Sequence, residues 1–127
     1  MKIVLLGYGK MGKEIEKIAV ARKHEVVLKV DENNHHAITK EQLAAADVAI
    51  EFSTPHTVEQ NICKCFDANL PIVVGTTGWY DNFEKITDDC KKKNSALFHA
   101  TNFSIGVNLF FKVNKYLADL MNDYPDY

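Results

Sequence analysis

The sequence predicts an α/β fold in which a doubly wound parallel sheet lies between two layers of helices. Two observations favour it. Five short apolar runs of strand length alternate with stretches whose apolar residues recur at helical spacing. The first run ends in a glycine-rich turn, residues 7–12, that opens the first helix. Because right-handed crossovers join parallel strands, we expect a three-layer α/β/α arrangement.

Each element follows from a local pattern. The predicted strands cover residues 2–6, 25–30, 48–52, 72–74 and 96–99. Thr39 and Gln42 match a capping box, so a short helix should start there. Thr54 is expected to cap the next helix, with Pro55 at its first position. Two further helices are predicted at about 80–93 and 105–122, the last with Leu109, Val113, Leu117 and Leu120 or Met121 facing inward.

Length and composition set the class of protein. The 127 residues suffice for one domain, which we expect to cover residues 1–127. The formal net charge of −2 gives no support to nucleic-acid binding. No apolar run approaches the ~20 residues of a membrane helix, so no membrane contact is predicted. Three unpaired cysteines, Cys63, Cys65 and Cys90, suggest reduced thiols in a cytoplasmic protein.

The glycine pattern Gly7-x-Gly9-x-x-Gly12 predicts a dinucleotide site of the Rossmann type. Gly7 would permit the tight turn, Gly9 would let the backbone approach a pyrophosphate, and Gly12 would let the helix pack close to the sheet. The diphosphate would rest on free N–H groups at the positive end of the helix.

Asp31 ends the second strand, 19 residues after Gly12, where the ribose-binding acid of such sites is expected. Its carboxylate would repel a 2′-phosphate, at about 4 kcal/mol for two charges ~4 Å apart. Since Glu32 is also acidic, NADH is the preferred cofactor. Lys10 and Lys13 leave NADPH possible.

Other polar groups admit two interpretations. The loop Gly75-Thr76-Thr77-Gly78 could hold a ribose, a carboxamide or a carboxylate, or form an ordinary turn. His35 and His36 are interpreted as a solvated pair, because no third ligand stands at metal spacing. No metal site is therefore predicted. His99, at a strand end, is the histidine with the best case for a role.

Three segments together resemble one family. Residues 50–55 (Ile-Glu-Phe-Ser-Thr-Pro), 74–78 (Val-Gly-Thr-Thr-Gly) and 102–108 (Asn-Phe-Ser-Ile-Gly-Val-Asn) occur in the order and spacing of dihydrodipicolinate reductase. The resemblance runs from Ile3 to the last helix. It implies an NAD(P)H-dependent oxidoreductase of lysine and diaminopimelate biosynthesis that reduces 4-hydroxy-tetrahydrodipicolinate, a cyclic imine dicarboxylate, and is usually a homotetramer.

The resemblance also implies roles for single residues. Gly7 to Gly12 would hold the pyrophosphate, Asp31 the ribose, and Thr77 would also lie near a substrate carboxylate. The implied cofactor-binding residues are Gly7, Tyr8, Gly9, Lys10, Met11, Gly12, Asp31, Phe52, Ser53, Gly75, Thr76, Thr77, Ala100, Thr101, Asn102 and Phe103.

The sequence departs from the family in one important respect. The family's catalytic stretch, with its His-His-x-x-Lys segment, is not present, so no catalytic residue is predicted and a substrate domain is expected to be absent. Alone, the chain should bind NADH weakly and turn over little or no substrate. The alternative is a stand-alone NAD(H)-binding module without activity. Another two-domain dehydrogenase, such as one acting on aspartate, fits the Gly-Thr-Thr-Gly and Asn-Phe-Ser segments less well.

Overall fold

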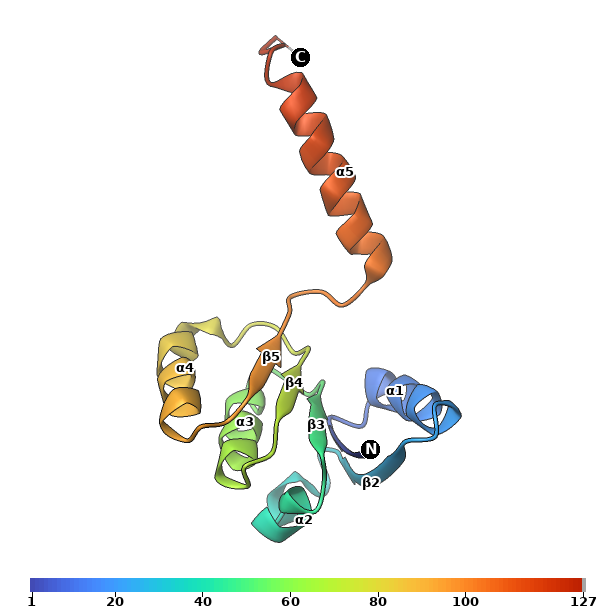
Figure 1. The fold of residues 1–127 in the computed structure, drawn as a ribbon, viewed down its shortest axis with the longest axis vertical. Helices are drawn as coiled ribbons and strands as arrows, with labels where there is room; N and C mark the ends of the chain where they lie inside the picture. The colour runs from blue at the N-terminus through green and yellow to red at the C-terminus, as the bar shows by residue number, and fades with distance from the viewer. Residues whose placement is uncertain (127) are drawn as a thin grey trace.

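The computed structural model describes residues 1–126 and contains a five-stranded, fully parallel sheet (Figure 1). The strands are β1 (Lys2–Leu6), β2 (Glu25–Val30), β3 (Val48–Glu51), β4 (Ile72–Val74) and β5 (Leu97–His99). The helices are α1 (Lys10–Ala21), α2 (Lys40–Ala44), α3 (Val58–Asp67), α4 (Phe83–Lys92) and α5 (Ile105–Met121), with short 3-10 turns η1 (His35–Ala37) and η2 (Tyr80–Asn82). The predicted α/β class and the five strands are confirmed.

The strand order is β2-β1-β3-β4-β5. The chain therefore moves outward from β1 to β2, then returns to the other side of β1 and continues through β3 to β5. In open parallel sheets, ligands bind beyond the carboxyl ends of the strands at the point where the order reverses. Here that point lies between the ends of β1 and β3, where Leu6 is paired with Glu51.

The sheet separates two apolar cores. Alternate strand residues face opposite sides, and Val4 and Leu6 of β1 pack with buried residues of α2, α3 and α4, whereas Ile3 and Leu5 pack with Ala19 of α1. The larger core contains Val30, Leu43, Ala49, Val58, Ile62, Cys65, Phe66, Leu70, Ile72, Val74, Trp79 and Ile86. The three predicted layers are thus present, with α1 alone on the second face.

The start of α3 corrects one prediction. The helix begins at Val58, and Thr54 and Pro55 lie in the turn before it. The Thr54 carbonyl oxygen accepts the N–H groups of Thr57 and Val58, both at 3.1 Å, while the Thr54 hydroxyl contacts the Thr57 hydroxyl at 3.0 Å. Because that hydroxyl is engaged within the turn, it does not cap the helix. The capping box of Thr39 and Gln42 is confirmed.

The orientation predicted for the last helix is wrong. No residue of α5 is buried, and the helix extends away from the sheet (Figure 1). The residues expected to face inward, Leu109, Val113, Leu117, Leu120 and Met121, are 56%, 65%, 54%, 52% and 38% exposed. The helix itself is confirmed, but its apolar pattern carries no information on what the helix packs against. Among residues 1–126, no helix has the length and hydropathy needed to cross a bilayer.

Candidate functional site

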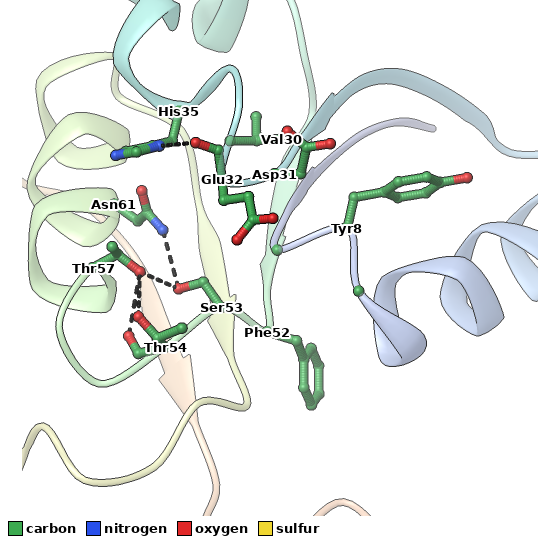
Figure 2. A pocket seen from close by; sticks show the side chains of 12 residues that line it. Tyr8, Val30, Asp31, Glu32, His35, Phe52, Ser53, Thr54, Thr57 and Asn61 are labelled. Atoms are coloured by element: carbon green, nitrogen blue, oxygen red, sulfur yellow. Dashed lines mark hydrogen bonds between the residues drawn. The ribbon is translucent and has the colours of Figure 1, made fainter.

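Three adjoining cavities follow the carboxyl edge of the sheet, and Phe52 lines all of them. The first, of about 530 Å³, is lined by Gly7, Tyr8, Gly9, Val30, Asp31, Glu32, His35, Phe52, Ser53, Thr54, Thr57 and Asn61 (Figure 2). The second, of about 450 Å³, is lined by Gly9, Lys10, Met11, Phe52, Ser53, Pro55, Gly75, Thr76 and Thr77. The third, of about 410 Å³, is lined by Met11, Phe52, Gly75, Thr101, Asn102, Phe103 and Ser104. The loops named from the sequence therefore form one continuous groove.

The structure brings nearly all the predicted cofactor-binding residues to this groove. Gly12 and Ala100 are the two that line none of the three cavities. Gly12 lies behind the turn, and the Ala100 N–H is directed to the carbonyl oxygen of Val74 at 3.4 Å. Gly12, within α1, and Ala100, in the loop after β5, therefore support the groove from behind rather than lining its surface.

The turn at Gly7 needs glycine for two reasons. Its φ of +99° is in the region that L side chains rarely adopt. A Cβ atom would also stand 2.1 Å from the carbonyl oxygen of Phe52. The N–H groups of Gly7 and Tyr8 both donate to the Val30 carbonyl oxygen, at 2.9 and 2.8 Å. The turn thus fastens the end of β1 to the ends of β2 and β3.

The N-terminus of α1 is open toward the groove. A Cβ atom on Gly12 would stand 2.4 Å from the Gly7 carbonyl oxygen, so the helix can only approach the turn this closely with glycine there. A Cβ atom on Gly9 would meet nothing within 4 Å. No side chain caps α1, and its first turn holds no acid. Its unpaired N–H donors and positive dipole end can therefore hold an anion.

Asp31 and Glu32 lie at the end of β2 and orient differently. Asp31 Oδ1 accepts the Asn33 N–H at 2.8 Å, which holds the carboxylate toward its own turn. Figure 2 shows the Glu32 carboxylate reaching into the groove, between Asn61 and the glycine turn. Asp31 still lines the cavity. Two acids therefore line this end of the groove, and the motif pointed to only one of them, Asp31.

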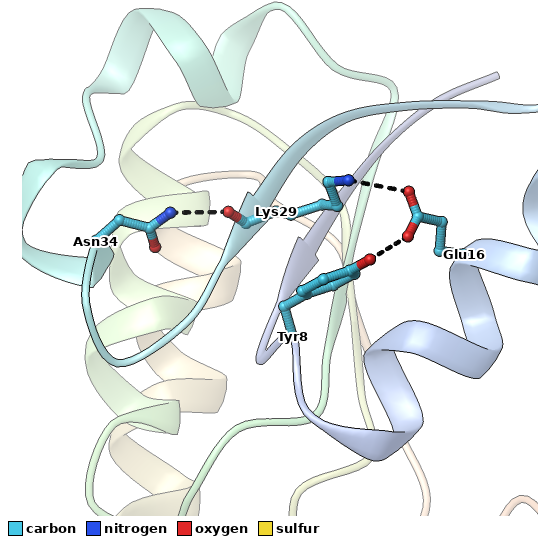
Figure 3. A network of polar contacts seen from close by, with 4 residues as sticks. All are labelled: Tyr8, Glu16, Lys29 and Asn34. Atoms are coloured by element: carbon cyan, nitrogen blue, oxygen red, sulfur yellow. Dashed lines mark hydrogen bonds and ion pairs between the residues drawn. The ribbon is translucent and has the colours of Figure 1, made fainter.

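Tyr8 belongs to a polar network on the outer side of the glycine turn (Figure 3). Its hydroxyl donates to Glu16 of α1, and Lys29 of β2 lies 3.1 Å from the other Glu16 oxygen and 5.1 Å from the centre of the Tyr8 ring. The hydrogen bond to Glu16 raises the pKa of Tyr8, and the same bond lowers the pKa of Glu16. The ring is thereby held at the rim, pointing away from Asn61 and Thr57 (Figure 2).

The far end of the groove is built by the loops after β4 and β5. A Cβ atom on Gly75 would stand 2.1 Å from the Phe52 ring, which therefore packs directly on this backbone. The Phe52 and Phe103 ring centres are 6.0 Å apart. Asn102 accepts the Ser104 N–H at 2.8 Å, and Ser104 caps α5 by accepting the Val107 N–H at 3.3 Å. This end offers Thr77 and backbone groups beside two aromatic rings.

Sequence reasoning missed part of the first cavity. His35, Thr54, Thr57 and Asn61 line it and were not named as binding residues. The spacing of Thr57 and Asn61, four residues apart directly after the Ser53 loop, was the available signal, because such residues share a helix face. Among residues 1–126, no three His, Cys, Asp or Glu side chains gather as metal ligands would.

The comparisons with known proteins agree with this geometry. The family model for the N-terminus of dihydrodipicolinate reductase matches residues 1–103. A 4-hydroxy-tetrahydrodipicolinate reductase of Christiangramia forsetii is 45% identical over 128 aligned positions, covering 100% of this chain and 52% of the relative. The Staphylococcus aureus (strain MRSA252) reductase of the same name is 34% identical, covering 98% of this chain and 53% of its own. The chain thus spans about half the length of these relatives.

Solved structures support the fold. A dihydrodipicolinate reductase from Paenisporosarcina sp. TG-14, with dipicolinate bound, superposes with a TM-score of 0.71 at 24% identity, over 98% of this chain and 54% of that one. An Archaeoglobus fulgidus protein described as a homoserine dehydrogenase gives a TM-score of 0.62 at 14% identity, over 78% and 42%. On the family match and the site geometry together, the chain belongs to the dihydrodipicolinate reductase family, whose N-terminal part it matches.

Proposed function

We propose that residues 1–127 form the nicotinamide-dinucleotide-binding domain of a reductase that acts on 4-hydroxy-tetrahydrodipicolinate. The observation that carries the proposal is the continuous groove around Phe52, which joins the glycine turn, the acidic end of β2 and the loops after β4 and β5. Because it joins three cavities along the sheet edge, it suits an extended two-nucleotide ligand better than a compact one. Bound there, the cofactor supplies a hydride.

The residues of this chain bind and orient. The open N-terminus of α1 at Gly9 receives the diphosphate, and Asp31 with Glu32 receives the hydroxyls of the adenosine ribose. Gly75, Thr76, Thr77 and the backbone of residues 100–103 flank the nicotinamide end. Thr77 also contributes to the binding of the substrate, a cyclic imine dicarboxylate. No residue of this chain is proposed to exchange a proton with it.

NADH is the proposed cofactor rather than NADPH. Asp31 and Glu32 are both acidic, and like charges a few ångströms apart repel by several kcal/mol at the effective dielectric of a protein surface. Lys29, the cation in the network of Figure 3, is paired with Glu16 and is therefore not free to offset them.

A binding titration tests the proposal. NADH and NADPH are added to the purified chain, and the emission of Trp79, its single tryptophan, is followed together with the nucleotide fluorescence. Saturable binding with a lower Kd for NADH is expected, and Asp31→Ala should narrow the gap between the two cofactors. A chain that binds neither nucleotide would contradict the proposal. An unchanged ratio in Asp31→Ala would count only against the role of Asp31.

A non-catalytic NAD(H)-binding module is the second candidate, and both candidates lead to the same expectation for a reductase assay on this chain alone. The chain alone is expected to bind cofactor and to turn over little or no substrate. Full turnover by this chain alone would contradict the assignment of binding without catalysis.

A further inference from the structure

Glu51 is a buried acid directly behind the wall of the groove. It is the last residue of β3 and has no exposed surface. Its Oε1 atom accepts hydrogen bonds from the Ser53 N–H at 3.1 Å, from Asn61 Nδ2 at 3.3 Å and from the Ser53 hydroxyl. Its Oε2 atom is buried with no hydrogen-bond partner among the residues that the structure describes. Because burying a carboxyl group is costly, its presence here calls for a reason.

The bonds at Oε1 fix the direction of a relay of three hydroxyl groups, those of Ser53, Thr57 and Thr54. Figure 2 shows these three side chains at the groove. A hydroxyl has a single proton to donate. The Ser53 hydroxyl donates its one hydrogen bond to Glu51. Thr57 must therefore be the donor in the 2.9 Å contact between the Ser53 and Thr57 hydroxyls. Thr54 is then the donor in its 3.0 Å contact with Thr57. Every proton of this relay points inward, toward Glu51.

The direction of the relay decides what the wall offers to a ligand. Ser53, Thr54 and Thr57 all line the first cavity. With their protons turned inward, the Thr54 and Thr57 hydroxyls present oxygen lone pairs, which accept hydrogen bonds and cannot donate them. The Ser53 oxygen already accepts hydrogen bonds from Thr57 and from Asn61 Nδ2, the latter at 3.3 Å. Asp31 and Glu32 line the same cavity with further acceptors.

The hydroxyl groups of this relay have a second possible hydrogen-bonding arrangement, which a substitution can make favourable. Thr57 Oγ1 also lies 3.3 Å from the Thr54 carbonyl oxygen, a longer contact than the 2.9 Å to Ser53. If the link to Ser53 is lost, Thr57 can donate to that carbonyl. If the Thr57 hydroxyl is lost, Thr54 has no inward acceptor and can turn its proton toward the groove.

We infer that Glu51, acting through Ser53 and Thr57, is a positioning residue that keeps this wall an acceptor surface and so discriminates against a phosphate on the adenosine ribose. The inference rests on the proposed function. Ribose hydroxyls can donate to the wall. A 2′-phosphate carries close to two negative charges at neutral pH and offers hydrogen-bond acceptors. Facing the lone pairs of this wall, it has no donor to bind.

The test compares the Kd values of NADH and NADPH in the wild-type chain and in Thr57→Val. The side chain of Thr57 makes no capping bond to α3, so the helix keeps its start. One freed donor should lower the ratio of the NADPH Kd to the NADH Kd about two- to tenfold. Thr87→Val is the matched control, because the Thr87 hydroxyl bonds the Phe83 carbonyl at 2.8 Å within α4. Its ratio should equal that of wild type.

The readout separates positioning from loose packing, since a loosened loop weakens both cofactors alike and leaves the ratio unchanged. If circular dichroism shows that Thr57→Val does not fold, the ratio of the NADPH Kd to the NADH Kd is measured in Glu51→Gln instead. The Gln amide can turn an N–H toward Ser53, where the Glu51 carboxylate only accepts. If the folded variant has the wild-type ratio of the NADPH Kd to the NADH Kd, the inference is overturned and the proposed function is not. The same conclusion holds if Thr87→Val changes this ratio as much as the test variant does. A wild-type chain that binds neither nucleotide overturns the proposed function and this inference with it.

Discussion

The indole N–H of Trp79 donates a hydrogen bond to the carbonyl oxygen of Thr76 at 2.8 Å, across the turn that follows β4. Trp79 is 2% exposed, and the centre of its ring lies 5.7 Å from those of both Phe83 and His99. His99 is the last residue of β5. One side chain therefore ties the Gly75–Gly78 loop to the end of the neighbouring strand, on the side of the groove where we place the nicotinamide.

Replacing this side chain should loosen the loop. Trp79→Phe keeps an aromatic ring but leaves the Thr76 carbonyl without its partner, which costs about 1–3 kcal/mol for a buried group. We expect the free energy of unfolding, measured by urea titration and circular dichroism, to fall by that amount, and NADH binding measured by calorimetry to weaken. Tyr80→Phe is the control, because Tyr80 is 37% exposed and surface changes usually stay within about 0.5 kcal/mol. Equal stability of the two variants would exclude an anchoring role.

The same added methyl group should destabilise the fold at Gly7 and leave its stability unchanged at Gly9. Gly7→Ala forces a side chain into a φ of +99° and 2.1 Å from the Phe52 carbonyl oxygen. Such a position destabilises by more than about 1 kcal/mol. Gly9→Ala meets no atom within 4 Å, so its free energy of unfolding should match wild type. Thermal melts of the two variants measure this difference.

The cofactor titration then gives the second half of the comparison. The Gly9→Ala methyl group would occupy the open space above the N-terminus of α1, so this stable variant should bind NADH at least about tenfold more weakly, as the loss of roughly 1.4 kcal/mol implies. Wild-type affinity in Gly9→Ala would show that the diphosphate does not rest against this turn.

The fold was predictable because its signals are local. The glycine turn, the capping box at Thr39 and the strand-length apolar runs each depend on a few neighbouring residues. The edge of the sheet at which the loops meet followed from the parallel strands alone. These signals located the groove, and the family resemblance named most, but not all, of its lining residues.

The remaining features depend on contacts that the sequence does not express. The direction of the Asp31 carboxylate is set by the Asn33 N–H, and the late start of α3 by hydroxyl bonds among Ser53, Thr54 and Thr57. Apolar residues recur at the same helical spacing in α3, which is half buried, and in α5, which is exposed along its length. Periodicity predicts a helix but does not identify its partner.

Cys65 should make stability depend on pH in the alkaline range. Burial, with a smaller contribution from the charge of Glu51, raises the pKa of this thiol to about 12. In the unfolded chain the thiol ionises near pH 8.5. Between these values the native state holds the extra proton, so stability is fully present at lower pH and falls as pH rises, by up to about 1.4 kcal/mol per unit.

The variant Cys65→Ala isolates this effect from other groups that titrate in the same range. Urea titrations at about pH 8 and about pH 10 should show a steeper loss of unfolding free energy in wild type than in the variant, because only wild type has the thiol. Parallel losses in both proteins would mean that Cys65 ionises in the native state as readily as in the unfolded one.

Ile62 and Leu117 test whether helices α3 and α5 contribute equally to the stability of this chain. Both are aliphatic and lie on helices, but Ile62 of α3 is 0% exposed and Leu117 of α5 is 54% exposed. Ile62→Ala should lower the free energy of unfolding by about 2–5 kcal/mol, because it removes buried surface and leaves a cavity. Leu117→Ala should change it by no more than about 0.5 kcal/mol. A cost for Leu117→Ala close to that for Ile62→Ala, measured by urea titration of the 127-residue chain, would show that α5 is covered in solution.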